Sequence, residues 1–226
     1  MNVDAIFVPQ GAEYKAVYKG LLQAKTPVPP VFATPVGLIP LTRYLEQWRQ
    51  ENKFSTTQPA VLLMGLCGSL LPRHRVGDVV IYEHCLTVSG EYQECDRILT
   101  KQIEKKLENK VSRVRSLSCD RVISTAKEKH QLGKQYNTDV VDMEGIAALN
   151  VLSETNISVA MLRVVSDDSS HDIPNLSAAF NSDGALQTIP LATAMIQQPL
   201  GAIRLIQGAM QGLKTLQKIT AELFLV

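Results

Sequence analysis

Four short stretches of this sequence carry acidic residues, serines or glycines directly after a run of apolar residues. They are Gln10–Glu13, Gly65–Ser69, Asp142–Gly145 and Ser166–His171. A carboxyl group can give or take a proton during a reaction, and glycine allows a ligand to approach the backbone closely. Taken singly, an acid in such a place is typical of a helix cap or a first helical turn. These residues indicate shared chemistry only if the fold brings them together.

The apolar runs themselves are typical of buried strands, because they are apolar on both faces rather than alternating. We expect strands at Ala5–Pro9, Pro30–Pro35, Ala60–Leu66, Val79–Val88, Val114–Cys119, Asp139–Asp142 and Val159–Val165. We expect helices at Glu13–Gln23, Ile39–Gln50, Arg97–Leu107, Thr125–Tyr136 and Glu144–Leu152. This alternation predicts an α/β fold with a mostly parallel central sheet flanked by helices. Ligands bind beyond the carboxyl ends of the strands in such a sheet.

The C-terminal part of the chain has helical rather than strand-like patterns. Helices are expected at Asn175–Asp183, which ends at a glycine, and at Thr188–Gln197 and Leu200–Leu223. We therefore expect residues 1–226 to form a single domain, with residues 175–226 as C-terminal helices packing on it. The alternative for the last helix is attachment to a membrane surface, which we consider less favoured.

Composition excludes several classes of protein. The 226 residues carry a formal charge of +1, which argues against a protein built around nucleic acid or an anionic membrane surface. Neither a secretory leader nor a run of apolar residues that could span a bilayer is expected. The four cysteines lack paired spacing and are expected to be buried reduced thiols, which fits a cytoplasmic protein. The four histidines show no metal-ligand spacing, so we expect no metal site.

Considered together, the four stretches resemble the nucleoside phosphorylase and nucleosidase superfamily. The matching pieces are Glu13, Gly37, GLCGSLLPRHRVGDVV (Gly65–Val80), VVDMEGIAAL (Val140–Leu149) and RVVSD (Arg163–Asp167). Within it, the chain looks most like the methylthioadenosine/S-adenosylhomocysteine nucleosidases. It also resembles the hopanoid-associated phosphorylases, through VPQGAEYKAV near the start and NLSAAFNSDGALQ near the end. The resemblance implies a purine nucleoside as substrate, no cofactor, and a homo-oligomer with a dimer as first choice.

The resemblance gives Asp167 the role of general acid, which protonates the ring nitrogen of the departing purine. Ser166 would orient it. A free aspartic acid titrates near about 3.9, so desolvation or a neighbouring acid must favour its protonated form. Asp168 is the candidate neighbour, although an ordinary loop acid is the favoured interpretation.

The sugar and the base are assigned to other residues by the same resemblance. Glu144 would accept hydrogen bonds from the ribose hydroxyls and stabilise the positive charge that develops on the sugar. Met143 would pack on the ribose, with a plain core residue as the alternative. Val122 and Ile123 would contact the purine, where relatives often have an aromatic side chain. The lack of that aromatic weakens the expected base stacking.

The nucleophile is the part of the reaction that the sequence leaves open. Gly65 and Gly68 belong to the substrate-binding segment, and Glu13 would activate a water molecule as general base. Phosphorylases need a cationic phosphate site, and the first loop contains no arginine. Against hydrolysis, nucleosidases usually carry a serine where this chain has Leu66, and Ser69 lies three residues later.

These residues predict a purine nucleosidase that cleaves the N-glycosidic bond of a 5′-modified adenosine and releases adenine. The 5′ group would be methylthio, homocysteinyl or a lipid. One alternative is a phosphate-dependent purine nucleoside phosphorylase of the hopanoid-associated kind, with phosphate as second substrate. The other is a nucleoside-binding protein without turnover, although the three acids Glu13, Glu144 and Asp167 argue against it.

Overall fold

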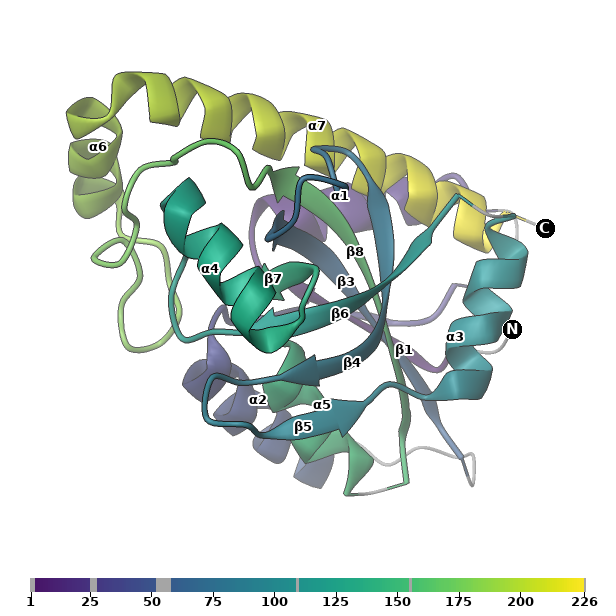
Figure 1. Cartoon of the computed structure of the whole chain (residues 1–226). Coiled ribbons are helices and arrows are strands. Elements are labelled where there is room, and N and C mark those ends of the chain that lie inside the picture. The colour runs from purple at the N-terminus through teal and green to yellow at the C-terminus, as the bar shows by residue number, and fades with distance from the viewer. Residues whose placement is uncertain (1–2, 25–27, 52–57, 109, 155, 226) are drawn as a thin grey trace.

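The computed structural model describes residues 3–24, 28–51, 58–108, 110–154 and 156–225. Its centre is a sheet to which these residues contribute eight strands (Figure 1). They are β1 (Ala5–Pro9), β2 (Val31–Thr34), β3 (Ala60–Ser69), β4 (Val79–Leu86), β5 (Tyr92–Glu94), β6 (Ser112–Ser118), β7 (Val140–Asp142) and β8 (Ser158–Asp167). The order along the sheet is β2-β1-β3-β7-β6-β4-β5, and β8 pairs with both β3 and β4.

Most of the strand pairs are parallel, as the alternation of apolar runs and helices predicts. The parallel pairs are β1–β2, β1–β3, β3–β8, β4–β6 and β6–β7. The antiparallel pairs are β3–β7, β4–β5 and β4–β8. The predicted α/β fold with a mostly parallel sheet is therefore confirmed.

Helices cover both faces of the sheet. The helices α2 (Leu38–Glu51) and α5 (Gly145–Ser153) lie on one face, whereas α1 (Ala12–Leu21), α3 (Arg97–Lys106) and α7 (Pro199–Phe224) lie on the other. Alternate side chains of each central strand enter the two cores, since Phe7 packs beside α2 and Ile6 beside α1. The helix α4 (Ala126–Tyr136) packs over the ends of β6 and β7. All four cysteines are buried and free.

The strands differ from the predicted ones mainly in length. Gly65–Ser69 was expected to follow the third strand, but it continues β3, because the ladder with β8 extends to the pair Gly68 and Asp167. Ser166 and Asp167 likewise end β8 rather than follow it. The short strand β5 was missed, because its sequence Tyr-Gln-Glu has neither an apolar run nor clear alternation.

The C-terminal part contains one wrong prediction. Residues Asn175–Asp183 form turns and an isolated bridge between Phe180 and Leu186 instead of a helix. The side-chain oxygen of Asn181 accepts the backbone N–H groups of residues 183 and 185 at 3.0 and 2.8 Å, which replaces helical hydrogen bonds. The two helices that follow, α6 (Thr188–Gln197) and α7, agree with the prediction.

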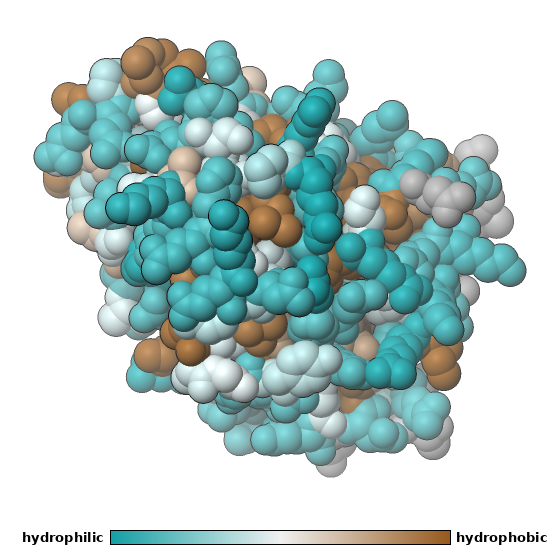
Figure 2. Space-filling view, viewed as in Figure 1, coloured by the Kyte–Doolittle hydropathy of each residue, from teal (hydrophilic) through white to brown (hydrophobic). Residues whose placement is uncertain are grey.

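The long helix α7 crosses the molecule above β8 (Figure 1). Its second half buries Leu216, Ile219 and Leu223 against α1 and the sheet, as expected of a packing helix. Apolar side chains are exposed near α6 and the start of α7, including Ile189 and Ile196, and Figure 2 shows them gathered at that end. Within the described ranges, every helix is too short or too polar to cross a membrane.

Candidate active site

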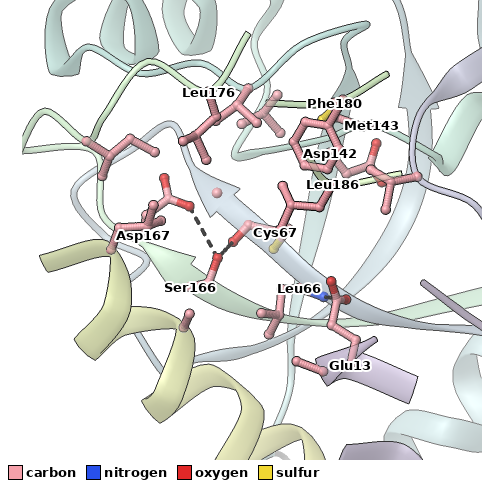
Figure 3. Close-up of a pocket in the computed structure, with 18 of the residues that line it drawn as sticks. Glu13, Leu66, Cys67, Asp142, Met143, Ser166, Asp167, Leu176, Phe180 and Leu186 are labelled. Carbon is pink, nitrogen blue, oxygen red and sulfur yellow. Dashed lines mark hydrogen bonds between the residues drawn. The ribbon is translucent and has the colours of Figure 1, made fainter. Parts of the chain in front are cut away.

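A cavity of about 460 Å³ lies where β1, β3, β7 and β8 end (Figure 3). Its lining includes eight of the predicted site residues: Glu13, Gly68, Val122, Ile123, Met143, Glu144, Ser166 and Asp167. The remaining one, Gly65, lies between two of the charged groups, because a Cβ atom there would overlap Glu13 Oε2 and Arg163 Nη1. Residues that are far apart in the sequence therefore meet at one site.

Glu13 reaches from the first turn of α1 to the strand β3. Its Oε2 accepts the backbone N–H of Leu66 at 2.7 Å, so it does not cap its own helix. Burial raises the pKa of Glu13 to about 7, and the charge of Glu144 adds to the rise, although Arg163 and the Leu66 N–H oppose it. A carboxyl group that titrates near neutral pH is suited to general acid or base catalysis.

Glu144 stands just before α5 and is buried, with 6% of its surface exposed. Its side chain makes no capping hydrogen bond; instead, Oε1 accepts the Gly37 N–H at 3.3 Å. Burial raises the pKa of Glu144, Arg163 lowers it, and Asp142 raises it further. Asp142, in contrast, acts as a cap, because it accepts the Gly145 N–H at 3.2 Å and the Ser118 hydroxyl at 2.7 Å.

Arg163 is the charged group that sequence reasoning missed at this end of the cavity. It lies on β8 with 1% of its surface exposed, and its Nη2 is 3.5 Å from Glu144 Oε2 and 4.0 Å from Asp142 Oδ2. Its Nε and Nη1 have no hydrogen-bond partner among the described residues. The carboxyl groups that act on its charge are those of Glu144, Asp142 and Glu13. The residue was missed because it stands inside an apolar strand sequence.

Asp167 ends β8 on another side of the cavity. The Ser166 hydroxyl lies 3.2 Å from Asp167 Oδ1 and 3.3 Å from the Cys67 carbonyl oxygen (Figure 3). Gly68 leaves room for this carboxyl group, because a Cβ atom there would be 2.9 Å from Asp167 Oδ2. Ser166 thus contacts the carboxyl group of Asp167, and its role in orienting that group stays a prediction.

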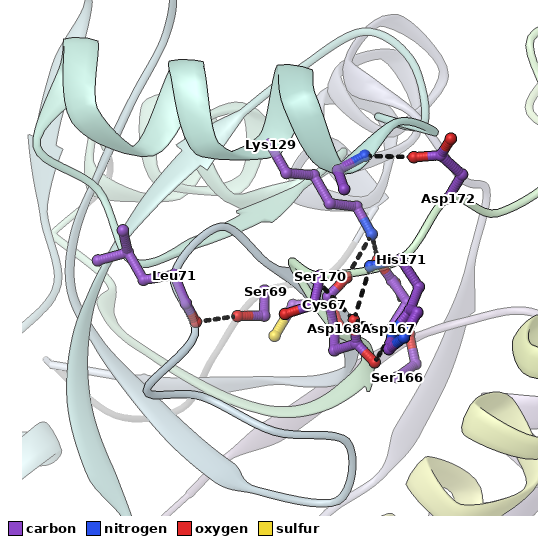
Figure 4. A network of polar contacts seen from close by, with 11 residues as sticks. Cys67, Ser69, Leu71, Lys129, Ser166, Asp167, Asp168, Ser170, His171 and Asp172 are labelled. Carbon is purple, nitrogen blue, oxygen red and sulfur yellow. Dashed lines mark hydrogen bonds and ion pairs between the residues drawn. The ribbon is translucent and has the colours of Figure 1, made fainter.

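The neighbour of Asp167 is a lysine rather than an acid (Figure 4). Lys129 of α4 forms an ion pair with Asp167 Oδ2 and donates to the Asp168 carbonyl oxygen at 2.8 Å. The Asp168 carboxylate binds His171 Nδ1 at 2.9 Å instead, so it does not serve as the neighbouring acid. Lys129 was missed because a lysine in a charged helix normally faces solvent.

The wall of the cavity that contains Val122 and Ile123 also contains an aromatic residue. Val122 and Ile123 line the cavity, and Phe180 lines it too and packs in one cluster with Val122. Phe180 belongs to the segment that was wrongly expected to be a helix. Ser69 does not line the cavity, because its hydroxyl donates to the Leu71 carbonyl oxygen at 2.7 Å.

The far wall of the cavity is apolar and comes from the C-terminal part of the chain. Its members are Leu176, Leu186, Leu191, Met195, Leu205, Ile206, Ala209 and Leu213. Among the residues that the structure describes, no group of three or more His, Cys, Asp or Glu side chains could hold a metal ion. The site thus combines buried acids at one end with a large apolar wall at the other.

Solved structures with the same fold include two kinds of hydrolase. Futalosine hydrolase of Helicobacter pylori strain 26695 has a TM-score of 0.69 at 13% identity, with 97% of this chain and 95% of that chain covered. The 5′-methylthioadenosine/S-adenosylhomocysteine nucleosidase of Helicobacter pylori with butyl-thio-DADMe-Immucillin-A has a TM-score of 0.66 at 15% identity, covering 97% of each chain. A mutant of that nucleosidase, with 5′-methylthioadenosine in its active site, has a TM-score of 0.64 at 14% identity, covering 97% and 98%.

These identities show a shared fold. A search of curated proteins found no match to the sequence. A sequence model of the phosphorylase superfamily matches residues 56–196, which is more than half of the chain and contains β3, β7 and β8 with their site residues. The chain belongs to the phosphorylase superfamily.

Proposed function

We propose that this protein is a purine nucleosidase that cleaves the N-glycosidic bond of a 5′-modified adenosine and releases adenine. The observation that carries the proposal is one cavity with Asp167 on one side and Glu13 across from it (Figure 3). The solved nucleosidase that holds 5′-methylthioadenosine has the same fold, which supports this class of substrate.

Each acid has a separate task in the reaction. Asp167 delivers a proton to a ring nitrogen of the purine, which makes the base a better leaving group. Glu144 binds the ribose hydroxyls and stabilises the positive charge that develops on the sugar. Glu13 in its ionised form removes a proton from the attacking water, and its pKa of about 7 suits that task near neutral pH.

The charge around Glu13 favours water over phosphate as nucleophile. Arg163 is surrounded by the carboxyl groups of Glu13, Glu144 and Asp142, so acids outnumber the cation there. The cation in the described lining is Arg121, which is paired with Glu128. A phosphate dianion would have to approach excess negative charge without a free cationic partner. A phosphorylase is therefore the second candidate, because the cation beside Glu13 and Glu144 is Arg163, which is buried and is not part of the described cavity lining.

The apolar wall bears on the 5′ substituent. A methylthio group or a longer alkyl chain would remove apolar surface from water there, worth about 25 cal/mol per Å². A homocysteinyl group would bring two charges, for which the described lining of α6 and α7 provides no partner. Because these helices form this wall, we also propose that residues 1–226 work as one domain. The homodimer and the cytoplasmic location stay predictions.

The test offers the protein three nucleosides: methylthioadenosine, S-adenosylhomocysteine and an adenosine with a long alkyl chain at the 5′ carbon. Each is incubated with and without phosphate, and adenine and the sugar product are measured. We expect free sugar at the same rate in both buffers. Sugar 1-phosphate formed only with phosphate would establish the phosphorylase instead, and binding without any adenine would establish a nucleoside-binding protein.

A further inference from the structure

Lys129 differs from the other lysines of α4 in being completely buried. Its side chain is 0% exposed, whereas Lys127 and Lys134 are exposed. The ammonium group is held by Asp167 Oδ2 and the Asp168 carbonyl oxygen (Figure 4). Removing an ammonium group from water is strongly unfavourable unless a partner compensates. The chain therefore keeps a costly buried charge directly behind its general acid.

The ion pair keeps one contact with the cavity. The Asp167 side chain is 14% exposed, and Asp167 lines the cavity while Lys129 does not. A purine bound over Asp167 would replace the remaining water there. Two opposite charges that lose their contact with water become less favourable relative to a neutral amine and carboxylic acid. Substrate binding would thus drive a proton from Lys129 to Asp167.

We propose that Lys129 supplies the proton that Asp167 delivers to the departing purine. The proposal rests on the proposed function, and Lys129 is a positioning residue because it acts through Asp167. An Nζ–H bond breaks and leaves its electron pair on a neutral amine. The proton passes through the Asp167 carboxyl group to the ring nitrogen, and Asp167 ends as the carboxylate that it was. The amine regains a proton through Asp167 when the products have left.

Other titratable groups surround the pair. They are Asp168 and His171 in the loop after β8, His74 across from that loop, Cys67 on β3, and Glu128 and Asp172 near the start of α4. The carboxylates among them accept hydrogen bonds from groups other than Lys129. Burial keeps the Cys67 thiol protonated by raising its pKa. Among the described titratable groups, Lys129 is thus the proton donor that contacts the Asp167 carboxyl group.

The proposal makes a specific prediction about pH. In Lys129→Met, the one proton available is that of the Asp167 carboxyl group itself, so activity should survive only at low pH. A carboxylic acid gives up its proton at a lower pH than an ammonium group does, so the decline of kcat at high pH should begin at a lower pH in the variant than in wild type. At pH 8 we expect kcat to be at least about 100-fold below that of wild type. At pH 5, where protonation of Glu13 slows both proteins, kcat of the variant should be within about tenfold of wild type at the same pH.

Control variants separate this role from a structural one. Lys134→Met changes an exposed lysine of the same helix and should keep the wild-type profile. Lys129→Gln retains hydrogen-bond donors for Asp167 and Asp168 but has no proton to give. It should behave like Lys129→Met, and it serves if the methionine variant fails to fold, as judged by circular dichroism. A decrease by the same factor at every pH, or an unchanged profile, would overturn the proposal.

A second measurement does not depend on turnover. Carbon-13 NMR of the Asp167 carboxyl group, in the protein saturated with adenine, reports its protonation in wild type and in Lys129→Gln. We expect Asp167 to keep its proton to a higher pH in wild type than in Lys129→Gln. A lysine that acts only as a paired cation favours the carboxylate and would give the opposite order, and either that order or identical titrations would overturn the role of Lys129. If wild-type protein releases adenine from no nucleoside, the proposed function fails, and the NMR titration still decides the question of Lys129.

Discussion

The two ends of the cavity handle buried acids in different ways. The proposed function places the purine at one end, the base end, which is formed by Ser166, Asp167 and Lys129 and where one carboxylate has one lysine. It places the ribose at the other, the sugar end, where Glu13, Glu144 and Asp142 share Arg163. Acid and cation are therefore equal in number at the base end, whereas acids outnumber the cation at the sugar end.

This difference matches the two halves of the reaction. A departing purine needs a proton, which a carboxylate with its own ammonium group can provide. A sugar that becomes positively charged needs negative charge close by, which unbalanced carboxylates provide. The number of cations for each acid, rather than the presence of acids alone, therefore distinguishes the two ends.

The largest expected effect concerns the base end. Asp167→Asn keeps the shape of the side chain but removes the acid, so the rate of adenine release should fall by about 10²–10⁴-fold. Binding of adenine, measured by calorimetry, should change little because the apolar contacts remain. The matched control is Asp183→Asn, an exposed acid outside the described cavity lining. Full activity in Asp167→Asn would refute its role as general acid.

The next prediction concerns the cation of the sugar end. Arg163→Met leaves buried carboxylates without a partner, and the free energy of unfolding should fall by about 3–5 kcal/mol at pH 8. The loss should be smaller at pH 5, because the unpaired carboxyl groups then take up protons. Urea unfolding at the two pH values measures it, with the exposed Arg97→Met as control. Equal losses at both pH values would show that the carboxylates do not depend on Arg163.

Glu13 permits a test of the pH dependence at the same end. Its folded-state pKa is about 7 against an ordinary value of 4.5, so its stabilising contribution is complete below 4.5 and is lost as the pH rises through 7. Relative to Glu13→Gln, the wild type should therefore lose about 3 kcal/mol of stability between pH 4 and pH 8. Because the ionised form acts as base, kcat of the wild type should rise through pH 7. Parallel stability curves for the two proteins would contradict this assignment.

The sequence predicted the acids at both ends of the cavity better than the cations that pair with them. Acids at strand ends could be found because apolar runs mark the strands and the motifs around Glu144 and Asp167 are distinctive. The partners of these acids could not be found in the same way. Lys129 stands in a charged helix, where its local sequence looks like that of a solvated lysine. Arg163 stands in an apolar strand, where its local sequence looks like that of a core segment. Their pairing depends on packing between elements far apart in the chain.

Phe180 shows a second limit of sequence reasoning. The segment around it has a helix-like pattern with a stop at Gly184, yet the side chain of Asn181 binds nearby backbone N–H groups and forms turns instead. Those turns carry Phe180 to the cavity beside Val122. Competition between side-chain and helical hydrogen bonds determines whether such a segment forms turns or a helix. The pattern of apolar residues does not reveal which set of hydrogen bonds forms.

The smallest expected effect lies beyond the sugar end, on the apolar wall. Leu205→Ala removes part of the α7 surface that faces the cavity, which costs about 1–2 kcal/mol for an alkyl chain packed there. KM for the adenosine with a long 5′ alkyl chain should rise about tenfold, whereas KM for adenosine should change little, because adenosine does not reach the wall. The control is Ile203→Ala, an exposed position on the same helix. An equal rise in KM for both nucleosides would mean that Leu205 maintains the shape of the whole site and does not specifically contact the 5′ substituent.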